Sequence, residues 1–217
     1  MLARFLRRLG RRFALARQER RVARWRREGC PLPMPGAAKR ALLAEVAARH
    51  GLKVFVETGT HRGDTVAALR EQFTRLVTIE LEPAKVETAR QRFSKDPGVE
   101  VLEGDSAQVL PGVVARLTEP ALFWLDGHYM GPGSGDATDH TPISAEIDSV
   151  LRHPVRRHVL LIDDARLFVG AEGYPRLDDL RASVAAQRPD LLWQVEHDVI
   201  RLEPPVGGTE GQRTRSA

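Results

Sequence analysis

The sequence predicts an α/β fold in which helices cover both faces of a doubly wound, mostly parallel sheet of seven strands. Short apolar runs alternate with longer amphipathic segments over residues 37–203, which is typical of parallel sheets. Only His197 and Asp198 separate the last two apolar runs, so we expect a hairpin that adds one antiparallel closing strand. A length of 217 residues with 42% hydrophobic residues suits one such domain.

The strands are assigned to short runs rich in aliphatic and aromatic residues, bounded by glycine, proline or charged residues. Each of the first five is followed by a helical pattern, so their connections are expected to be parallel crossovers. The last two runs have no helix between them. In chain order, the expected strands are residues 53–57, 76–80, 99–103, 121–126, 158–163, 192–196 and 199–203.

The helices are assigned to segments with apolar residues at helical spacing, and two of them have clear end signals. Gly51 is expected to cap the end of the first helix, because glycine readily adopts the left-handed conformation that this position needs. Pro83 is expected to open the third, where its missing N–H costs nothing. The expected helices are residues 37–50, 64–73, 83–93, 107–117, 142–152 and 176–187.

The charge of the chain is unevenly spread. Residues 1–40 hold 13 of the 33 Lys and Arg but two of the 29 acids, so they carry +11 and the rest carries −7. We divide the chain into a basic amphipathic arm with a Pro-rich linker (1–36), the folded domain (37–203) and a disordered tail (204–217). The acidic balance outside the arm argues against a nucleic-acid-binding active face.

The arm has several readings. Leu2, Phe5, Leu9 and Phe13 recur at helical spacing among arginines, which is typical of a helix on an anionic membrane surface. A contact with nucleic acid, a solvated arm, and a helix packed on its own domain or on a second copy in a homo-oligomer are the alternatives. The single cysteine and the lack of a secretory signal or a long apolar stretch predict a cytoplasmic protein, with peripheral membrane association through residues 1–28 as an option.

The segment from Val54 to Gly63 predicts a ligand site. A strand ending in Glu57 is followed by a turn that contains Gly59, Thr60 and Gly63, and then by a helical pattern. Glycine lets the backbone approach a ligand closely. The spacing is not Gly-x-Gly-x-x-Gly, which argues against a nicotinamide oxidoreductase. An acid before the turn favours a ligand with a cationic end, and S-adenosylmethionine has an amino group, a sulfonium and no phosphate.

Acids also end the next two strands, at the sheet edge where ligands of such folds bind. Glu80 lies roughly 20 residues after Gly59, where an acid typically holds the ribose hydroxyls of a cofactor. Asp105, followed by Ser106, has two readings: it accepts a hydrogen bond from an adenine amino group, or it caps the next helix.

Three further acids follow the fourth and fifth strands: Asp126, Asp163 and Asp164. Carboxylates this close repel one another unless a cation or protons compensate, and all-oxygen ligation suits Mg²⁺ or Ca²⁺. The alternative is that one acid caps a helix while the others bind water or Arg166. His128 follows Asp126 closely and is expected to act as a general base or metal ligand, or else to be structural.

The Gly-rich loop expected over residues 127–141 is long, and Gly and polar residues dominate it. Such segments at this sheet edge often close over substrates, and Tyr129 and His140 are the candidate contacts. The alternative is a disordered insertion.

Taken together, residues 37–203 resemble the class I S-adenosylmethionine-dependent methyltransferases, which have a Rossmann-like fold. Glu57-Thr-Gly-Thr-His-Arg-Gly63 resembles their first motif, Glu80 their ribose acid, and Gly104-Asp105-Ser106 their adenine-side motif. Phe-Trp-Leu-Asp-Gly-His-Tyr and Leu-Ile-Asp-Asp-Ala-Arg-Leu-Phe are similar to bacterial methyltransferase-like proteins and to the macrocin O-methyltransferase and cephalosporin-hydroxylase-like group. That resemblance implies Mg²⁺ held by Asp126, Asp163 and Asp164, with His128 as the base, although the spacing of His128 differs slightly.

These observations predict a methyltransferase that uses S-adenosylmethionine, with or without Mg²⁺, to methylate a hydroxyl of a small molecule or sugar. The rival readings are a non-catalytic Rossmann-like binding protein and, with less support from the glycine spacing, a nicotinamide oxidoreductase.

Overall fold

The computed structural model describes residues 16–126 and 142–206, and within them the predicted seven-stranded sheet is confirmed. The strand order is β3-β2-β1-β4-β5-β7-β6. β7 pairs antiparallel with both β5 and β6, and the other pairings are parallel, as the two-residue His197-Asp198 turn predicts. The strands are β1 Val54–Thr58, β2 Arg75–Glu80, β3 Val99–Glu103, β4 Ala121–Leu125, β5 Val159–Ile162, β6 Leu192–Glu196 and β7 Val199–Glu203.

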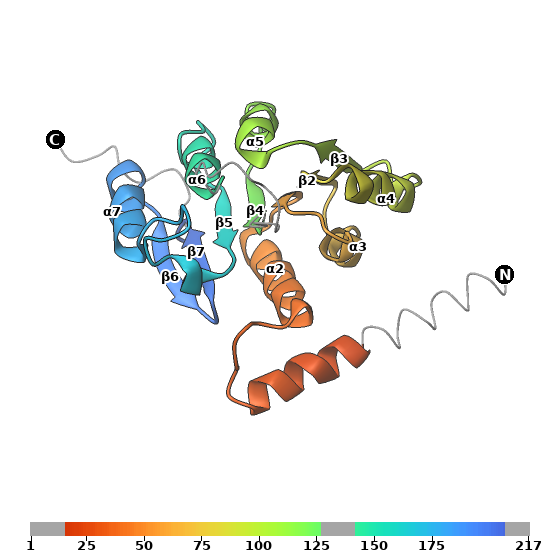
Figure 1. Ribbon diagram of the computed structural model, residues 1–217, viewed down its shortest axis with the longest axis horizontal. Coiled ribbons are helices and arrows are strands. Elements are labelled where there is room, and N and C mark those ends of the chain that lie inside the picture. Colours follow the sequence, from red (N-terminus) through yellow and green to blue (C-terminus); the bar gives the residue numbers. More distant parts are fainter. Residues whose placement is uncertain (1–15, 127–141, 207–217) are drawn as a thin grey trace.

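Helices cover both faces of the sheet (Figure 1). One apolar cluster joins alternate residues of β1, β4 and β5 to α5, α6 and α7, and a second joins the intervening residues to α2, α3 and α4. The alternation of Val54 and Val56 with Phe55 between these clusters is the two-residue period of a strand that is buried on both faces. The helices are α2 Gly36–His50, α3 Asp64–Leu69, α4 Pro83–Phe93, α5 Ser106–Val114, α6 Ile143–Leu151 and α7 Leu177–Gln187.

Most elements agree with the sequence-based ranges to within one or two residues, and α3 is the clearest difference. The predicted helix over residues 64–73 ends at Leu69. The chain then turns towards β2, while Phe73 packs on Phe55 of β1 with a ring-centroid distance of 5.3 Å. Phe73 is therefore buried, as its place in the apolar pattern predicts, but it lies after the end of the helix and not within it. A short 3₁₀ helix, η1 (Ala165–Leu167), follows β5 and was not predicted.

The described part of the basic arm forms a helix over residues 16–27 that packs on the domain. Trp25 is only 5% exposed and shares the α2-side cluster with Met34 and Leu43. Its indole N–H donates to the Pro31 carbonyl, and its ring meets His197 edge-on. Packing on its own domain, one of the alternatives left open for the arm, thus holds for this helix. Among residues 16–126 and 142–206, no helix combines the length and apolar character needed to cross a bilayer.

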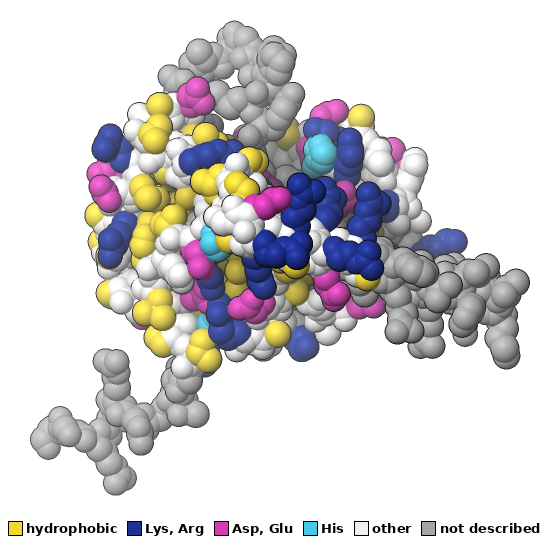
Figure 2. Space-filling model, turned by 90° about the horizontal axis from the view of Figure 1, so that it is seen from below, with side chains coloured by type: hydrophobic (Ala, Val, Ile, Leu, Met, Phe, Trp, Pro, Cys, Tyr) yellow, Lys and Arg dark blue, Asp and Glu magenta, His cyan; other side chains and the backbone are white. Residues whose placement is uncertain are grey.

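The outward side of this helix is basic. Six arginines of the helix are exposed: Arg17, Arg20, Arg21, Arg24, Arg26 and Arg27. Figure 2 shows Lys and Arg side chains gathered on this face of the molecule.

Candidate active site

The sheet register brings the predicted acids to one edge. Thr58 of β1 lies beside Leu125 of β4, and Leu125 lies beside Ile162 of β5. The acids that follow continue this ladder, because the N–H of Asp126 donates to the Thr58 carbonyl at 3.2 Å and the N–H of Asp163 donates to the Leu125 carbonyl at 3.1 Å. The two carboxylates therefore leave neighbouring strands at the same level, on the side covered by α2.

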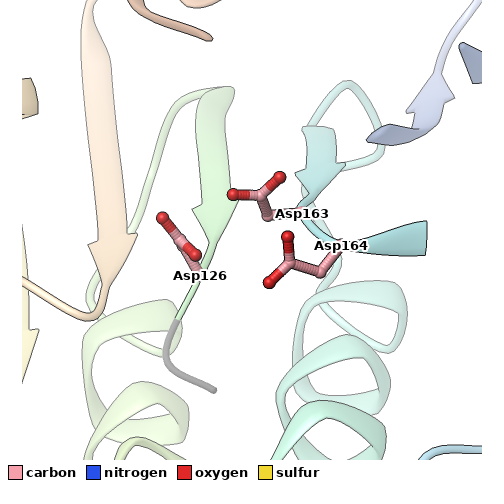
Figure 3. Close-up of side chains that lie close together, drawn as sticks. All are labelled: Asp126, Asp163 and Asp164. Atoms are coloured by element: carbon pink, nitrogen blue, oxygen red, sulfur yellow. The ribbon is translucent and has the colours of Figure 1, made fainter. Parts of the chain in front are cut away.

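Asp126, Asp163 and Asp164 converge, as the sequence predicts. One carboxylate oxygen from each lies within 4.8 Å of the others (Figure 3). Asp163 is fully buried, and its Oδ1 has no hydrogen-bond partner among the described residues. Such a donor set of oxygens suits a hard divalent cation, and the unpartnered oxygen offers it a ligand.

Lys39 completes this cluster, and sequence reasoning did not identify it. Its ammonium group donates to Asp163 Oδ2 and lies 5.8 Å from the centre of the Trp124 ring. Burial lowers the pKa of Lys39, but the carboxylates of Asp163, Asp126 and Asp164 outweigh this effect, so the pKa is raised and the lysine stays charged. In the sequence, Lys39 is one lysine in an expected helix, and no motif marks it as a site residue.

Arg166 compensates part of the remaining charge. It pairs with Asp164 Oδ1 at 2.8 Å and also with Asp198 in the β6–β7 turn. Asp198 in turn accepts the backbone N–H of Arg166 at 2.8 Å, which ties the loop after β5 to the hairpin. The predicted alternative of an Arg166 pairing is thus observed for Asp164, alongside the convergence of the three acids.

The surroundings of Asp126 and Asp163 nonetheless disfavour the charged form of each carboxyl group. Burial, and then repulsion from Asp163, raises the pKa of Asp126 to about 8, against the opposing effect of Lys39. Burial also raises the pKa of Asp163, although Lys39 lowers it in part. A cation bound here would relieve both effects.

The glycine turn after β1 needs its glycines. Gly59 and Gly63 have φ values of 84° and 68°, in the left-handed region that costs glycine little. A Cβ on Gly63 would also come within 2.8 Å of the Phe93 ring. The backbone can therefore pass close to a ligand at Gly59 and close to α4 at Gly63.

Glu57 lies beneath this turn on the α2 side. It is 2% exposed and accepts a 2.9 Å hydrogen bond from the Thr78 hydroxyl. The Thr60 and Thr78 hydroxyls lie 2.6 Å apart and share a hydrogen bond. Burial raises the pKa of Glu57 to about 8, against the hydrogen bond from Thr78, and nearby Asp126 and Glu80 add to the rise. The carboxyl is therefore largely protonated at neutral pH and would gain from a cationic neighbour.

Glu80 and Asp105 end or follow the next two strands. Glu80 is 8% exposed and accepts the backbone N–H groups of His61 and Glu82. Asp105 caps α5, because its Oδ1 accepts the N–H of Ala107 at 2.9 Å, and Ser106 begins that helix. The capping reading of Asp105 thus describes this structure, and its Oδ2 accepts a 3.4 Å hydrogen bond from the Gln108 side-chain amide.

Glu146 is a second site residue that the sequence analysis did not identify. It lies in the first turn of α6, is fully buried, and neither carboxylate oxygen has a hydrogen-bond partner among the described residues. The Thr58 hydroxyl is likewise buried and unpartnered there. Burial raises the pKa of Glu146 to about 7, although the nearby Ser106 and Thr58 hydroxyls lower it. The feature that could have identified Glu146 in the sequence is its position on the apolar side of an amphipathic helix, where an acid is unusual.

Three predicted residues lie outside the described part of the chain. These are His128, the expected base, and the candidate substrate contacts Tyr129 and His140. The structure therefore does not test their roles.

Several solved methyltransferases align with this chain. O-methyltransferase TomG from Streptomyces achromogenes, in complex with S-adenosylmethionine, aligns with a TM-score of 0.60 at 20% identity over 89% of this chain and 90% of that one. A Bacillus cereus O-methyltransferase in complex with S-adenosylhomocysteine gives 0.57 at 17% identity, covering 87% and 90%. The 23S rRNA methyltransferase ErmE gives 0.50 at 19% identity, covering 76% and 68%. No protein-family model and no curated protein sequence matches the chain.

The chain therefore has the fold of S-adenosylmethionine-dependent O-methyltransferases, as the sequence predicts. Because ErmE acts on RNA within the same fold, the fold does not identify the methyl acceptor.

Proposed function

We propose that this chain is a methyltransferase that transfers a methyl group from S-adenosylmethionine to a hydroxyl oxygen of a small molecule or sugar. One observation carries the proposal. In a fold shared with O-methyltransferases, the carboxyl ends of β1, β4 and β5 gather Glu57, Asp126 and Asp163, three acids whose pKa values are raised because they are buried. Such an edge favours a ligand that brings positive charge.

The cofactor is proposed to lie across the glycine turn. The cofactor would contact the backbone of the turn at Gly59, Thr60 and Gly63. Glu57 would lie beneath the cationic end of the cofactor. Glu80 would accept from the ribose hydroxyls, since each of its carboxylate oxygens accepts one backbone hydrogen bond and has a second lone pair for another donor. Asp105 and Ser106 would lie at the adenine. Asp126 would face both the cofactor and the acceptor.

Methyl transfer requires an in-line approach of the acceptor oxygen to the methyl carbon, so positioning supplies much of the rate. We assign the removal of the hydroxyl proton to His128. Asp126, Asp163 and Asp164 would hold Mg²⁺, whose chemistry when bound is to orient the acceptor and lower the pKa of its hydroxyl.

A peripheral contact between residues 1–28 and an anionic membrane surface is a further part of the proposal. The six exposed arginines of helix 16–27 support it, because each basic residue near such a surface adds a favourable electrostatic contribution.

Calorimetry with S-adenosylmethionine and, separately, with NAD tests the cofactor. We expect binding of the first and none of the second. Binding of NAD alone would refute the proposal in favour of an oxidoreductase. Screening of small-molecule extracts with methyl-labelled cofactor then tests for transfer.

The acceptor found in that screen allows the metal to be tested. We expect transfer to stop in chelator, to return with Mg²⁺, and to be lost in Asp126→Asn. Asp96→Asn is the matched control, since Asp96 lies away from this edge in a pair with Arg70. Full transfer in chelator would remove Mg²⁺ from the proposal and leave the methyltransferase.

A further inference from the structure

The acidic cluster already contains a cation of the protein's own. Lys39 is supplied by α2, 124 residues before Asp163 in the sequence, and its ammonium group contacts Asp163 Oδ2. Its side chain is 20% exposed and that of Asp163 only 1%, so the pair is largely shielded from water. An ion pair in this setting is screened far less than one on the surface.

Lys39 is held in place by its helix. Its neighbour Ala38 is 2% exposed and packs in the same cluster as Trp25 and Met34, while Leu43, one turn further on, is fully buried. The start of α2 therefore cannot move away from the sheet without opening this cluster. The backbone at Lys39 is therefore fixed, while its long side chain is flexible and extends to the acids.

The contact leaves one ligand position open. Asp163 uses Oδ2 for Lys39, while Oδ1 is buried and unpartnered among the described residues. One carboxylate oxygen from each of Asp126, Asp163 and Asp164 lies within 4.8 Å of the other two. A divalent cation that uses these oxygens would lie only a few ångströms from the Lys39 ammonium, where like charges repel strongly.

We propose that Lys39 is a built-in competitor for the divalent cation of this cluster and sets how tightly the cation binds. The inference rests on the proposed function for the identity of the metal site, but it concerns the chain's own lysine. In the absence of metal, Lys39 compensates the carboxylates. Metal entry requires the ammonium to leave Asp163, or to remain at the cost of repulsion. Either way, the charge of Lys39 weakens metal binding.

Titration calorimetry of the full chain with Mg²⁺ alone, and with Mn²⁺ alone, tests this. We expect Lys39→Met to bind either ion about tenfold more tightly than the unsubstituted chain or better, because one nearby positive charge is removed. Lys39→Arg keeps the charge and should show no such gain. Lys53→Met is the matched control, since Lys53 is exposed and precedes β1 at the opposite end of the strand.

Thermal unfolding supplies a second readout that does not depend on activity. In chelator, Lys39→Met should unfold at a lower temperature, because the buried carboxylate of Asp163 loses its counter-ion. Mg²⁺ should then raise its unfolding temperature by more than it raises that of the unsubstituted chain.

Equal or weaker Mg²⁺ and Mn²⁺ binding by Lys39→Met would overturn the inference, and so would the absence of binding in both chains. Titration of the same proteins with S-adenosylmethionine separates this failure from failure of the proposed function. Cofactor binding with unchanged metal affinity would reject only the role of Lys39. Tighter metal binding without cofactor binding would reject the methyltransferase and retain the competition.

Discussion

The carboxylate of Glu80 accepts a 2.7 Å hydrogen bond from the backbone N–H of His61. Glu80 ends β2 and His61 lies in the glycine turn after the neighbouring strand β1, at a φ of 48°. The other Glu80 oxygen accepts the N–H of Glu82 at 3.1 Å. The acid proposed to hold the cofactor's ribose is thus also the acid that fixes the turn over which the cofactor would lie.

Replacement of Glu80 should therefore affect the cofactor site twice. We expect Glu80→Ala to weaken S-adenosylmethionine binding by about 1–3 kcal/mol, because charge-assisted hydrogen bonds to ribose are lost and the turn is no longer held. Glu80→Gln, which keeps one acceptor oxygen, should lose less. Calorimetry measures both. Glu82→Ala is the control, since its side chain is 52% exposed and pairs with Lys85. Unchanged affinity in Glu80→Ala would remove Glu80 from the site.

The proposed base can be tested once an acceptor is known. His128→Ala should lower kcat by about 10²-fold or more while leaving S-adenosylmethionine affinity unchanged, because a base acts on the acceptor's proton and not on the cofactor. Steady-state kinetics and cofactor titration together measure this. His140→Ala, in the same segment, is the comparison, and loss of a substrate contact there should raise KM instead. A His128→Ala enzyme with normal kcat would exclude the base role.

The buried carboxyl of Glu146 should make stability depend on pH. Its pKa is about 7 in the folded protein against an ordinary value of 4.5, because burial disfavours the charged form. Between these values the folded chain keeps a proton that the unfolded chain has released. The contribution of Glu146 to stability is therefore fully present below pH about 4.5 and is lost as pH rises through about 7.

Glu146→Gln should remove this loss. Relative to the unsubstituted chain, the free energy of unfolding should rise between pH 4 and pH 8, by up to about 3 kcal/mol for a shift of this size. Denaturant titrations at both pH values measure it. Glu119→Gln, at an exposed position, should show no such change. A Glu146→Gln variant whose stability difference is the same at both pH values would contradict the raised pKa.

The membrane contact is best tested by substitution, because deletion of the arm would remove the buried Trp25. The full chain should float with anionic vesicles at low salt and be released at high salt, since salt screens charge attraction. Replacement of Arg17, Arg20, Arg21 and Arg27 by Gln should reduce flotation and leave cofactor binding intact. Vesicles of neutral lipid are the control. Equal flotation of both chains would reject a role for this helix.

The sequence by itself determined the elements and the edge at which the site lies. Continuous apolar runs such as Val54 to Val56 define the strands, because a strand that is buried on both faces is apolar at successive positions. Gly59 and Gly63 mark a turn that other residues adopt at a cost. Since parallel strands end at one edge, acids placed after β4 and β5 were bound to meet. These features depend on residues that are close together in the chain, so they can be recognised from the sequence alone.

Only the tertiary structure decided which groups complete that edge. Lys39 and Glu146 lie on helices whose packing angles no local pattern encodes, and they approach the sheet from its two faces. Trp25 likewise belongs to a basic segment by sequence but to the core by packing. A side chain that is distant in sequence reaches such an acid only if its helix packs on the sheet at the matching position along the strands. That docking depends on the summed apolar contacts of the whole domain, so the counter-ion of Asp163 appears only once the chain is folded.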